Sequence, residues 1–372
     1  MKKSLVFSLL VMLAAWGVIG CKKDDEGTKP VAGGPDRQAL LVQLADSVVK
    51  PGYLRFSEKL SVLKSKTTAF TAAPTPATLL EARQAWLAAY VEWQKVELFE
   101  FGPAENVGLR NSFNIYPTDA AGIRQNISSG SYNFEVATAI AQQGFPALDY
   151  LLNGLASDDA AIAQQFASSA NHRRYLTEVV ARMDQKFGTV YGQWTGAYRN
   201  TFVNSTGTDA SSSLSRVVNA YVLYFERYLR AGKVGIPAGV MGGVSGTTYP
   251  DKIEAYYYRG TLPLQLAQTA HSATQQFFSG RSGRPSFKAY LDALGAKDSQ
   301  TKQSLSEIIS TQYGASYQQL SALGPNLYGT LQTRPADAVR SYDEMQKVVR
   351  LLKIDMTSAM GITLTYVDND GD

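Results

Sequence analysis

The sequence predicts an all-α protein made of two helical bundles packed side by side. Apolar and aromatic residues recur every three or four positions through most of the chain, which is the spacing of one buried helix face. A glycine-rich stretch at 233–250 interrupts this pattern and separates a first domain, 36–232, from a second, 251–372. Near the C-terminus GITLTYVD alternates as a strand does, so at most one short strand is expected.

The first residues have the pattern of a lipoprotein signal peptide. Lys2 and Lys3 precede a 15-residue apolar run, Leu5 to Ile19, and a small residue then leads to Cys21. Such a run is short for a membrane-spanning helix, although an uncleaved anchor with a chance cysteine is the alternative. Residues 1–20 are therefore predicted to be removed, and Cys21 to carry lipid in a bacterial cell envelope.

Residues 21–35 are predicted to form a tether. KKDDE at 22–26 resembles the lysine-plus-acidic signal that exports some Bacteroidetes lipoproteins to the outer face of the outer membrane. A solvated charge run is the alternative. The following GTKPVAGGP has no apolar periodicity and is typical of a flexible linker.

Composition excludes several classes of function. Cys21 is the only cysteine, so disulfides, cysteine-rich metal sites and thiol nucleophiles are excluded from the domain after the tether. The two histidines cannot make a three-histidine metal site within one chain. The formal charge of +4 falls to +2 without Lys2 and Lys3, and no basic block is present, so nucleic acid is not an expected partner.

The first long helix is expected from Thr78 to Phe101. It places Arg83, Trp86, Tyr90, Trp93 and Glu97 on one stripe. A buried Glu97 would need a partner or a cation, and Arg83, about 21 Å away along the axis, is too distant to serve. Alternatively, Glu97 bends out to water at the helix end.

Later stripes predict further helices. Two lie at 175–194 and 214–228, and the second half has four more, at Pro263–Phe278, Ser286–Leu294, Thr301–Leu323 and Pro335–Ser358. The short segment QGFPALDYLLNG predicts a helix that starts at Gly144, with Pro146 in its first turn, and ends at a left-handed Gly154.

Several segments, in this order, resemble the imelysin-like envelope proteins, also classed as M75 peptidases. EARQAWLAAYVEWQKVELFEFG is similar to the first long helix of that family and contains Arg83, Trp86 and Glu97. NIYPTD resembles a Trp-Pro-x-Asp segment, with Tyr116 in place of tryptophan and Asp119 retained.

The second half continues the resemblance. KIEAYYYRGTL resembles a Glu-x-x-aromatic-Ser stretch in which Glu254 and Tyr257 match and Tyr258 replaces serine. The C-terminal MGITLTYVDNDGD resembles the end of the family sequence. The family signature is Gly-x-His-x-x-Glu, and its counterpart GFPALD has Pro146 for histidine and Asp149 for glutamate.

The resemblance implies two helical bundles with a cleft between them, and a link to iron or haem acquisition. It implies Glu97 and Asp149 as ligands of iron or another divalent cation, and it implies six cofactor-binding residues: Arg83, Trp86, Tyr116, Asp119, Glu254 and Tyr257. Because a proline side chain has no lone pair with which to bind a metal, the loss of the histidine argues most strongly against peptidase activity.

The sequence therefore predicts a non-catalytic envelope lipoprotein that assists iron or haem uptake, with iron, haem or an outer-membrane uptake component as its partner. One alternative is a metallopeptidase with an altered ligand set, Glu97, Asp149 and Glu254. Another is an adaptor for a membrane partner.

Overall fold

Helices make up the regular structure of the computed structural model, which describes residues 35–241 and 246–366. Within those residues no strand is formed, and only an isolated bridge pairs Lys297 with Ser304. The predicted all-α class is therefore confirmed. None of the helices in these two ranges combines the length and apolar character needed to cross a bilayer.

The helices follow one another through short connections. The first half contains α1 (Arg37–Gln43), η1 (Leu44–Val49), α2 (Lys50–Ala72), α3 (Pro76–Trp93), α4 (Pro103–Val107), α5 (Leu109–Phe113), α6 (Ala120–Ser129), η2 (Ala137–Gln142), α7 (Gly144–Asp149), η3 (Tyr150–Gly154), α8 (Asp159–Ser168), α9 (Ala170–Thr195), α10 (Tyr198–Asn204), α11 (Ser213–Leu223) and η4 (Tyr224–Gly235). The second half contains η5 (Pro250–Lys252), α12 (Leu262–Ser279), α13 (Phe287–Ala293), α14 (Leu305–Ser321), α15 (Leu327–Thr333), α16 (Pro335–Arg350), η6 (Leu351–Met356) and α17 (Thr357–Met360). The segments η1, η3, η4 and η6 are π-helical and continue the preceding α-helix, whereas η2 and η5 are 3₁₀-helical.

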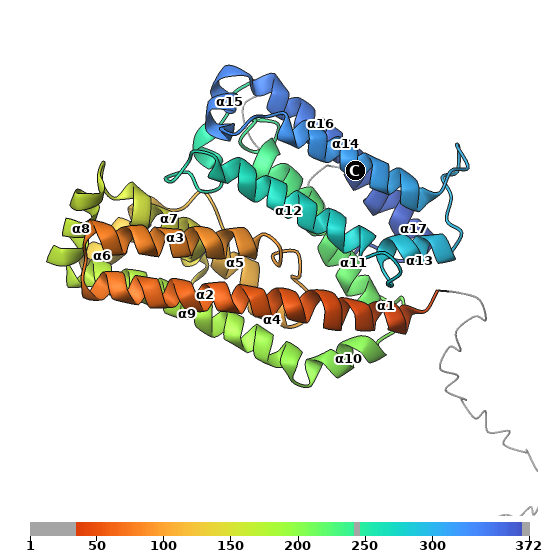
Figure 1. The fold of residues 1–372 in the computed structure, drawn as a ribbon, viewed down its shortest axis with the longest axis horizontal. Helices are drawn as coiled ribbons and strands as arrows, with labels where there is room; N and C mark the ends of the chain where they lie inside the picture. The colour runs from red at the N-terminus through yellow and green to blue at the C-terminus, as the bar shows by residue number, and fades with distance from the viewer. Residues whose placement is uncertain (1–34, 242–245, 367–372) are drawn as a thin grey trace, which may run out of the picture. The chain divides into compact units, whose positions relative to one another are not determined.

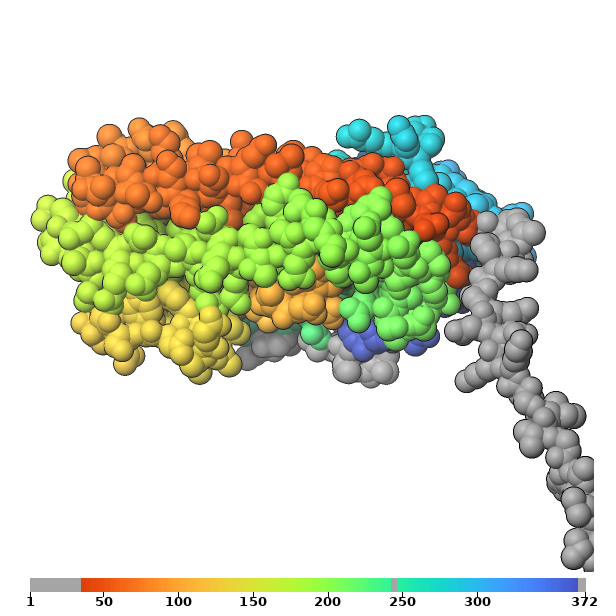
Figure 2. All heavy atoms as spheres, turned by 90° about the horizontal axis from the view of Figure 1, so that it is seen from below, coloured from red at the N-terminus to blue at the C-terminus, as the bar shows by residue number. Residues whose placement is uncertain are grey.

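Two groups of helices pack against each other (Figure 1). In the first group α2 packs along α3 and α9, and Figure 2 shows α2 and α9 side by side on one face. In the second group α16 packs on α14 and η4, and α12 packs on α14 and also touches α3. Buried residues of both groups form one continuous apolar cluster. The division into domains at 233–250 stays a prediction.

Local sequence explains where the helices begin. The side chains of Thr75 and Thr78 form a reciprocal capping box at the start of α3, and Pro76 occupies its first turn. Ser169 caps α9 by accepting a hydrogen bond from the backbone N–H of His172, and Ser286 caps α13 in the same way. These caps satisfy backbone donors that would otherwise lack partners at a helix start.

The alternating segment at the C-terminus does not pair as a strand over its described part, 361–366. Instead, the Asn219 side chain substitutes for a neighbouring strand. Its Oδ1 accepts the backbone N–H of Thr365 at 2.7 Å, and its Nδ2 donates to the carbonyl of Thr363 at 3.1 Å. One side-chain amide thus satisfies the backbone N–H of Thr365 and the backbone carbonyl of Thr363. The predicted lipidation residue Cys21 lies outside the described residues.

Candidate functional site

A buried cluster of charged side chains lies between the two groups of helices. Glu97, Lys233 and Glu254 come from separate parts of the chain, and each is only 2% exposed. The Nζ of Lys233 lies 2.7 Å from Oε2 of Glu254 and 3.7 Å from Oε2 of Glu97. The ammonium therefore supplies the counter-charge that two buried carboxylates need.

Neutral side chains complete the hydrogen bonding of this carboxylate cluster. The Nδ2 of Asn114 donates to Oε1 of Glu254 at 2.7 Å and to Oε1 of Glu97 at 2.9 Å. The hydroxyl of Tyr224 donates to Oε2 of Glu97 at 3.1 Å, and Nε2 of Gln94 donates to Oε1 of Glu254 at 2.9 Å. All four carboxylate oxygens have a partner, and among the side chains of this network only the Oε1 of Gln94 is buried without one in the described residues.

Glu97 reaches the cluster by a route that the sequence analysis did not predict. The helix expected to run to Phe101 ends at Trp93, and the backbone turns from 94 to 98. The expectation that Glu97 continues the helical stripe is therefore wrong. In the structure the side chains of Gln94 and Glu97 both point inward from this turn, where Gln94 bonds to Glu254 and Glu97 bonds to Asn114.

Lys233 is the site residue that the sequence analysis missed. The glycine-rich loop was expected to begin at this position, but η4 continues through Gly235 and Lys233 lies in its last turn. Ala231, Val234 and Gly235 around it are buried. The sequence signal was a single lysine among small and apolar residues at the end of a helix. Such a lysine indicates a buried ion pair, because buried lysine is rare unless paired.

Glu254 enters the cluster from a segment with an unusual backbone. Ala255 has φ of 55° and Arg259 has φ of 54°, both in the left-handed region that side chains disfavour. Glu254 points inward from this segment, while the backbone N–H groups of Tyr257 and Tyr258, three and four residues later, point to Asp149. Backbone strain of this kind costs about 1–3 kcal/mol per residue and is concentrated at functional sites.

Asp149 joins the signature segment to this bend. Its Oδ2 accepts the N–H of Tyr257 at 2.7 Å, and its Oδ1 accepts the N–H of Tyr258 at 2.9 Å and the Nδ2 of Asn153 at 3.1 Å. Two successive backbone N–H groups form a small anion-binding nest. Burial nevertheless raises the pKa of Asp149 from 3.8 to about 7, because desolvation outweighs the hydrogen bonds.

The start of the signature helix depends on a glycine. Gly144 has φ of +75°, and a Cβ added there would lie 2.3 Å from the carbonyl oxygen of Phe113. Only glycine fits this close approach. The helix runs from Gly144 through α7 and η3 to Gly154, as predicted. Gly154 is not left-handed, however; its missing side chain leaves room for the ring of Tyr257.

Two residues implied by the family resemblance hold the signature helix in place. Trp86 is fully buried on α3 and donates from Nε1 to the carbonyl oxygen of Phe145 at 3.1 Å. Arg83, one turn earlier on α3, donates to the carbonyl oxygen of Leu152 at 2.8 Å and pairs with Asp159 at 2.6 Å. In the structure both side chains position backbone rather than face a cavity.

The other implied residues fall into two places. Tyr116 and Tyr257 line a cavity of about 160 Å³, together with Pro146, Asp149 and the neighbouring residues Pro117, Thr118, Asp251, Ile253, Ala255 and Tyr256. Asp119 instead caps α6, because its Oδ1 accepts the N–H of Gly122 at 2.9 Å. That hydrogen bond, with one from Gln142, lowers the pKa of Asp119.

The side chains present do not fit a metal ion of the implied kind. Pro146 has no donor atom to offer, and the Lys233 ammonium already lies between Glu97 and Glu254. Asp149 is held by backbone N–H groups of another segment. Within 35–241 and 246–366 no three His, Cys, Asp or Glu side chains gather closely enough to hold a metal.

Comparisons with known proteins agree with the fold and with the resemblance. The crystal structure of an imelysin-like protein from Psychrobacter arcticum 273-4 has a TM-score of 0.68 at 17% identity, covering 89% of this chain and 97% of that one. The structure of an iron-regulated protein A precursor from Parabacteroides distasonis ATCC 8503 has a TM-score of 0.70 at 18% identity, covering 87% and 96%. These structures share the fold of this chain.

Sequence relatives point the same way. Iron-regulated protein A of Synechococcus elongatus (strain ATCC 33912 / PCC 7942 / FACHB-805) is 26% identical over 219 residues. That match covers 58% of this chain and 58% of the relative, so the chain spans little more than half the length of the relative it matches. The family model for imelysin, peptidase family M75, matches residues 49–347, and the chain therefore belongs to the imelysin family.

Proposed function

We propose that this protein is a non-catalytic accessory protein of iron acquisition, held on the cell envelope through a lipidated Cys21. The iron-linked role is supported by membership of the imelysin family and by similarity to a protein named for its regulation by iron. The envelope location is supported by the signal-peptide pattern at 1–21.

The single observation that carries the non-catalytic part is the position of Lys233. A metallopeptidase needs a cation with an open coordination position and a base beside it. Here an ammonium that belongs to the chain lies between the two buried carboxylates, and every carboxylate oxygen already has a hydrogen-bond or ion-pair partner. The cluster stabilises the contact between the halves of the chain.

The cavity beside this cluster suits a small group rather than a whole cofactor. Its volume of about 160 Å³ is below the roughly 300–1,000 Å³ of cavities that enclose drug-sized ligands. Haem therefore does not fit inside it. Tyrosine rings and two carboxyl groups, those of Asp149 and Asp251, surround the cavity, which favours a cationic or hydrogen-bonding group of a partner.

The proposal is tested in the native host by growth under iron limitation. Deletion of the gene is expected to slow growth when iron is chelated, and the wild-type gene to restore it. Asp251→Trp blocks the rim of the cavity and is expected to fail, whereas Glu58→Trp, an equivalent change on the exposed face of α2, is expected to succeed. Cys21→Ser is expected to release the protein from the envelope and also to fail.

Two results would overturn the proposal. If deletion leaves growth unchanged at every iron level, the iron-linked role is wrong. If the purified protein cleaves a peptide library and a chelator stops the cleavage, the protein is a metallopeptidase. Titration of the purified protein with ferrous and ferric iron is expected to show no tight stoichiometric binding at the carboxylate cluster.

A further inference from the structure

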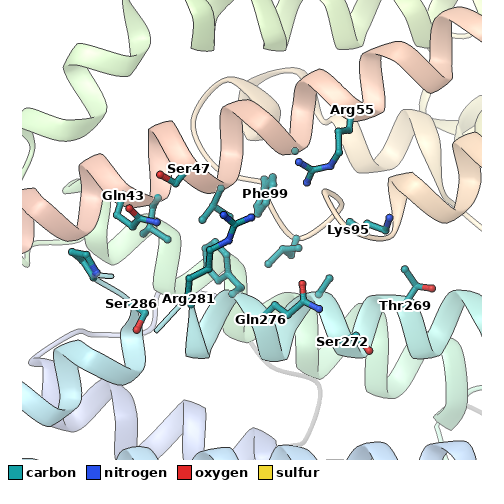
Figure 3. A pocket seen from close by; sticks show the side chains of 18 of the residues that line it. Gln43, Ser47, Arg55, Lys95, Phe99, Thr269, Ser272, Gln276, Arg281 and Ser286 are labelled. Atoms are coloured by element: carbon teal, nitrogen blue, oxygen red, sulfur yellow. The ribbon is translucent and has the colours of Figure 1, made fainter. Parts of the chain in front are cut away.

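A second and larger cavity lies between the N-terminal helices and α12. Its volume is about 520 Å³, and it shares no lining residue with the cavity around Asp149. Figure 3 shows side chains from α2, from the turn after α3 and from α12 around it. Cavities of this size enclose small molecules.

The backbone around this cavity is built to keep it open. Leu44, Ser47 and Val48 line it from η1, a π-helical turn inserted between α1 and α2. Such turns shift the side-chain register of a helix and are frequent at functional sites. Gly52 follows in the first turns of α2, and a Cβ there would lie 3.2 Å from the ring of Phe99. Glycine in a helix costs about 1 kcal/mol relative to alanine.

Hydrogen-bonding side chains and an apolar floor share the cavity wall. Gln43, Ser47, Ser272 and Gln276 are among the amides and hydroxyls that line it, and Figure 3 shows them arranged around one space. Apolar contact is supplied by five further residues, Leu44, Val48, Leu98, Phe99 and Phe277. This mixture suits an organic molecule that carries several polar groups.

The charge of the lining is positive. Arg55, Lys95 and Arg281 all line the cavity, from three separate segments. Glu92 is nearly buried and pairs with Arg55 at 3.2 Å and with Lys95 at 2.6 Å, so one carboxylate serves two cations. Within the described residues no hydrogen bond or ion pair joins the side chain of Arg281, which Figure 3 shows reaching toward Phe99.

We propose that this cavity binds a small organic anion with at least two acid groups. One acid group pairs with Arg281, whose planar guanidinium binds carboxylate or phosphate through two hydrogen bonds. A second acid group pairs with the terminal nitrogens of Arg55, since Glu92 is bonded only to its Nε, and the carbon skeleton lies on Phe99. The inference concerns a different cavity from the proposed function and stands or falls independently of it.

Calorimetric titration of the purified protein tests the proposal, with citrate and fructose 1,6-bisphosphate as probes of the two acid chemistries. At least one is expected to bind with a Kd below about 1 mM, and to bind more weakly at high salt because the cations are partly exposed. Arg281→Gln is expected to weaken binding about tenfold or more, the effect of losing a charged hydrogen bond. Arg284→Gln, in the same loop but outside the cavity, is the matched control.

A second variant checks the location by volume rather than charge. Ser272→Phe places a ring inside the cavity from α12 and is expected to abolish binding, while circular dichroism shows that the helices are retained. Binding of citrate marks a polycarboxylate site, and binding of fructose 1,6-bisphosphate alone marks a phosphate-ester site; either supports the proposal. Binding of neither probe, or equal losses in Arg281→Gln and Arg284→Gln, overturns it.

Discussion

Replacing Lys233 by methionine removes the only ammonium between two buried carboxylates while keeping a side chain of similar length. At an effective dielectric constant of 20, a charge pair is worth about 6 kcal/mol at the 2.7 Å separation from Glu254 and about 4 kcal/mol at the 3.7 Å separation from Glu97. Removing the lysine from water offsets several kcal/mol of this attraction. The expected net loss is about 3–5 kcal/mol of unfolding free energy.

Urea unfolding at pH 8, followed by circular dichroism, measures this loss. Adding Glu254→Gln to the variant removes one of the charges and is expected to restore part of the stability at pH 8.

Lys59→Met is the matched control, because Lys59 is exposed on α2 and such surface changes stay within about 0.5 kcal/mol. A loss of less than about 1 kcal/mol at pH 8 would refute the reasoning. So would a double variant with Glu254→Gln that is no more stable than Lys233→Met alone, since a lost packing contact would not be relieved by removing a charge.

Two further changes test the signature segment. Gly144→Ala is expected to cost about 3 kcal/mol or more in urea unfolding, because φ is +75° and the new Cβ meets the Phe113 carbonyl oxygen. The control is Gly188→Ala, in α9 with open space around it, which is expected to stabilise the protein by about 0.5–1 kcal/mol. Equal effects of the two changes would contradict the close approach at Gly144. Burial raises the pKa of Asp149 from 3.8 to about 7, so between these values the native state keeps a proton that the unfolded chain has lost. The contribution of this proton to stability is fully present below pH 3.8 and is lost as the pH rises through 7. The expected loss of unfolding free energy between pH 4.5 and 8 is about 3 kcal/mol. Asp149→Asn is expected to flatten this part of the pH profile and to cost about 1–3 kcal/mol at low pH, because one of the two backbone N–H groups loses its acceptor; an unchanged profile would show that Asp149 does not titrate in this range.

Much of the fold follows from helix periodicity. The stripe expected at 175–194 lies on α9, where Tyr175, Val179, Met183 and Trp194 are all buried. The helix expected at 263–278 corresponds to α12, which begins and ends one residue further out on each side. These predictions succeed because local spacing alone determines which face of a long helix is apolar.

The boundaries that failed were decided by polar contacts of individual side chains. The helix expected from Thr301 begins only at Leu305, after a turn in which Asp298 binds the backbone of Thr301 at 2.7 Å. The turn after Trp93 and the extension of η4 to Gly235 both serve the carboxylate cluster. Apolar spacing contains no information on such polar pairings, which join residues as far as 160 positions apart.

The candidate site was predictable in part. The sequence left Glu97 either buried with a partner or cation or bent out to water, and the structure shows it buried, with Lys233 as its counter-charge. The family resemblance marked Glu254 and Asp149, but the hydrogen bonds that occupy them involve Asn114 and the backbone of Tyr257 and Tyr258. Those partners could not be deduced, because an asparagine or a backbone N–H leaves no distinguishing sequence pattern.

The ammonium of Lys233 has a consequence for how the protein behaves when the supply of iron changes. A free ion reaches its site by diffusion, and its occupancy follows its concentration. A cation attached to the chain cannot be chelated, diluted or replaced by a competing metal, and it arrives with every folded molecule. The contact between the two groups of helices is therefore equally firm in iron-starved and iron-replete cells, and any response to iron must enter through the surface of the protein rather than through this cluster.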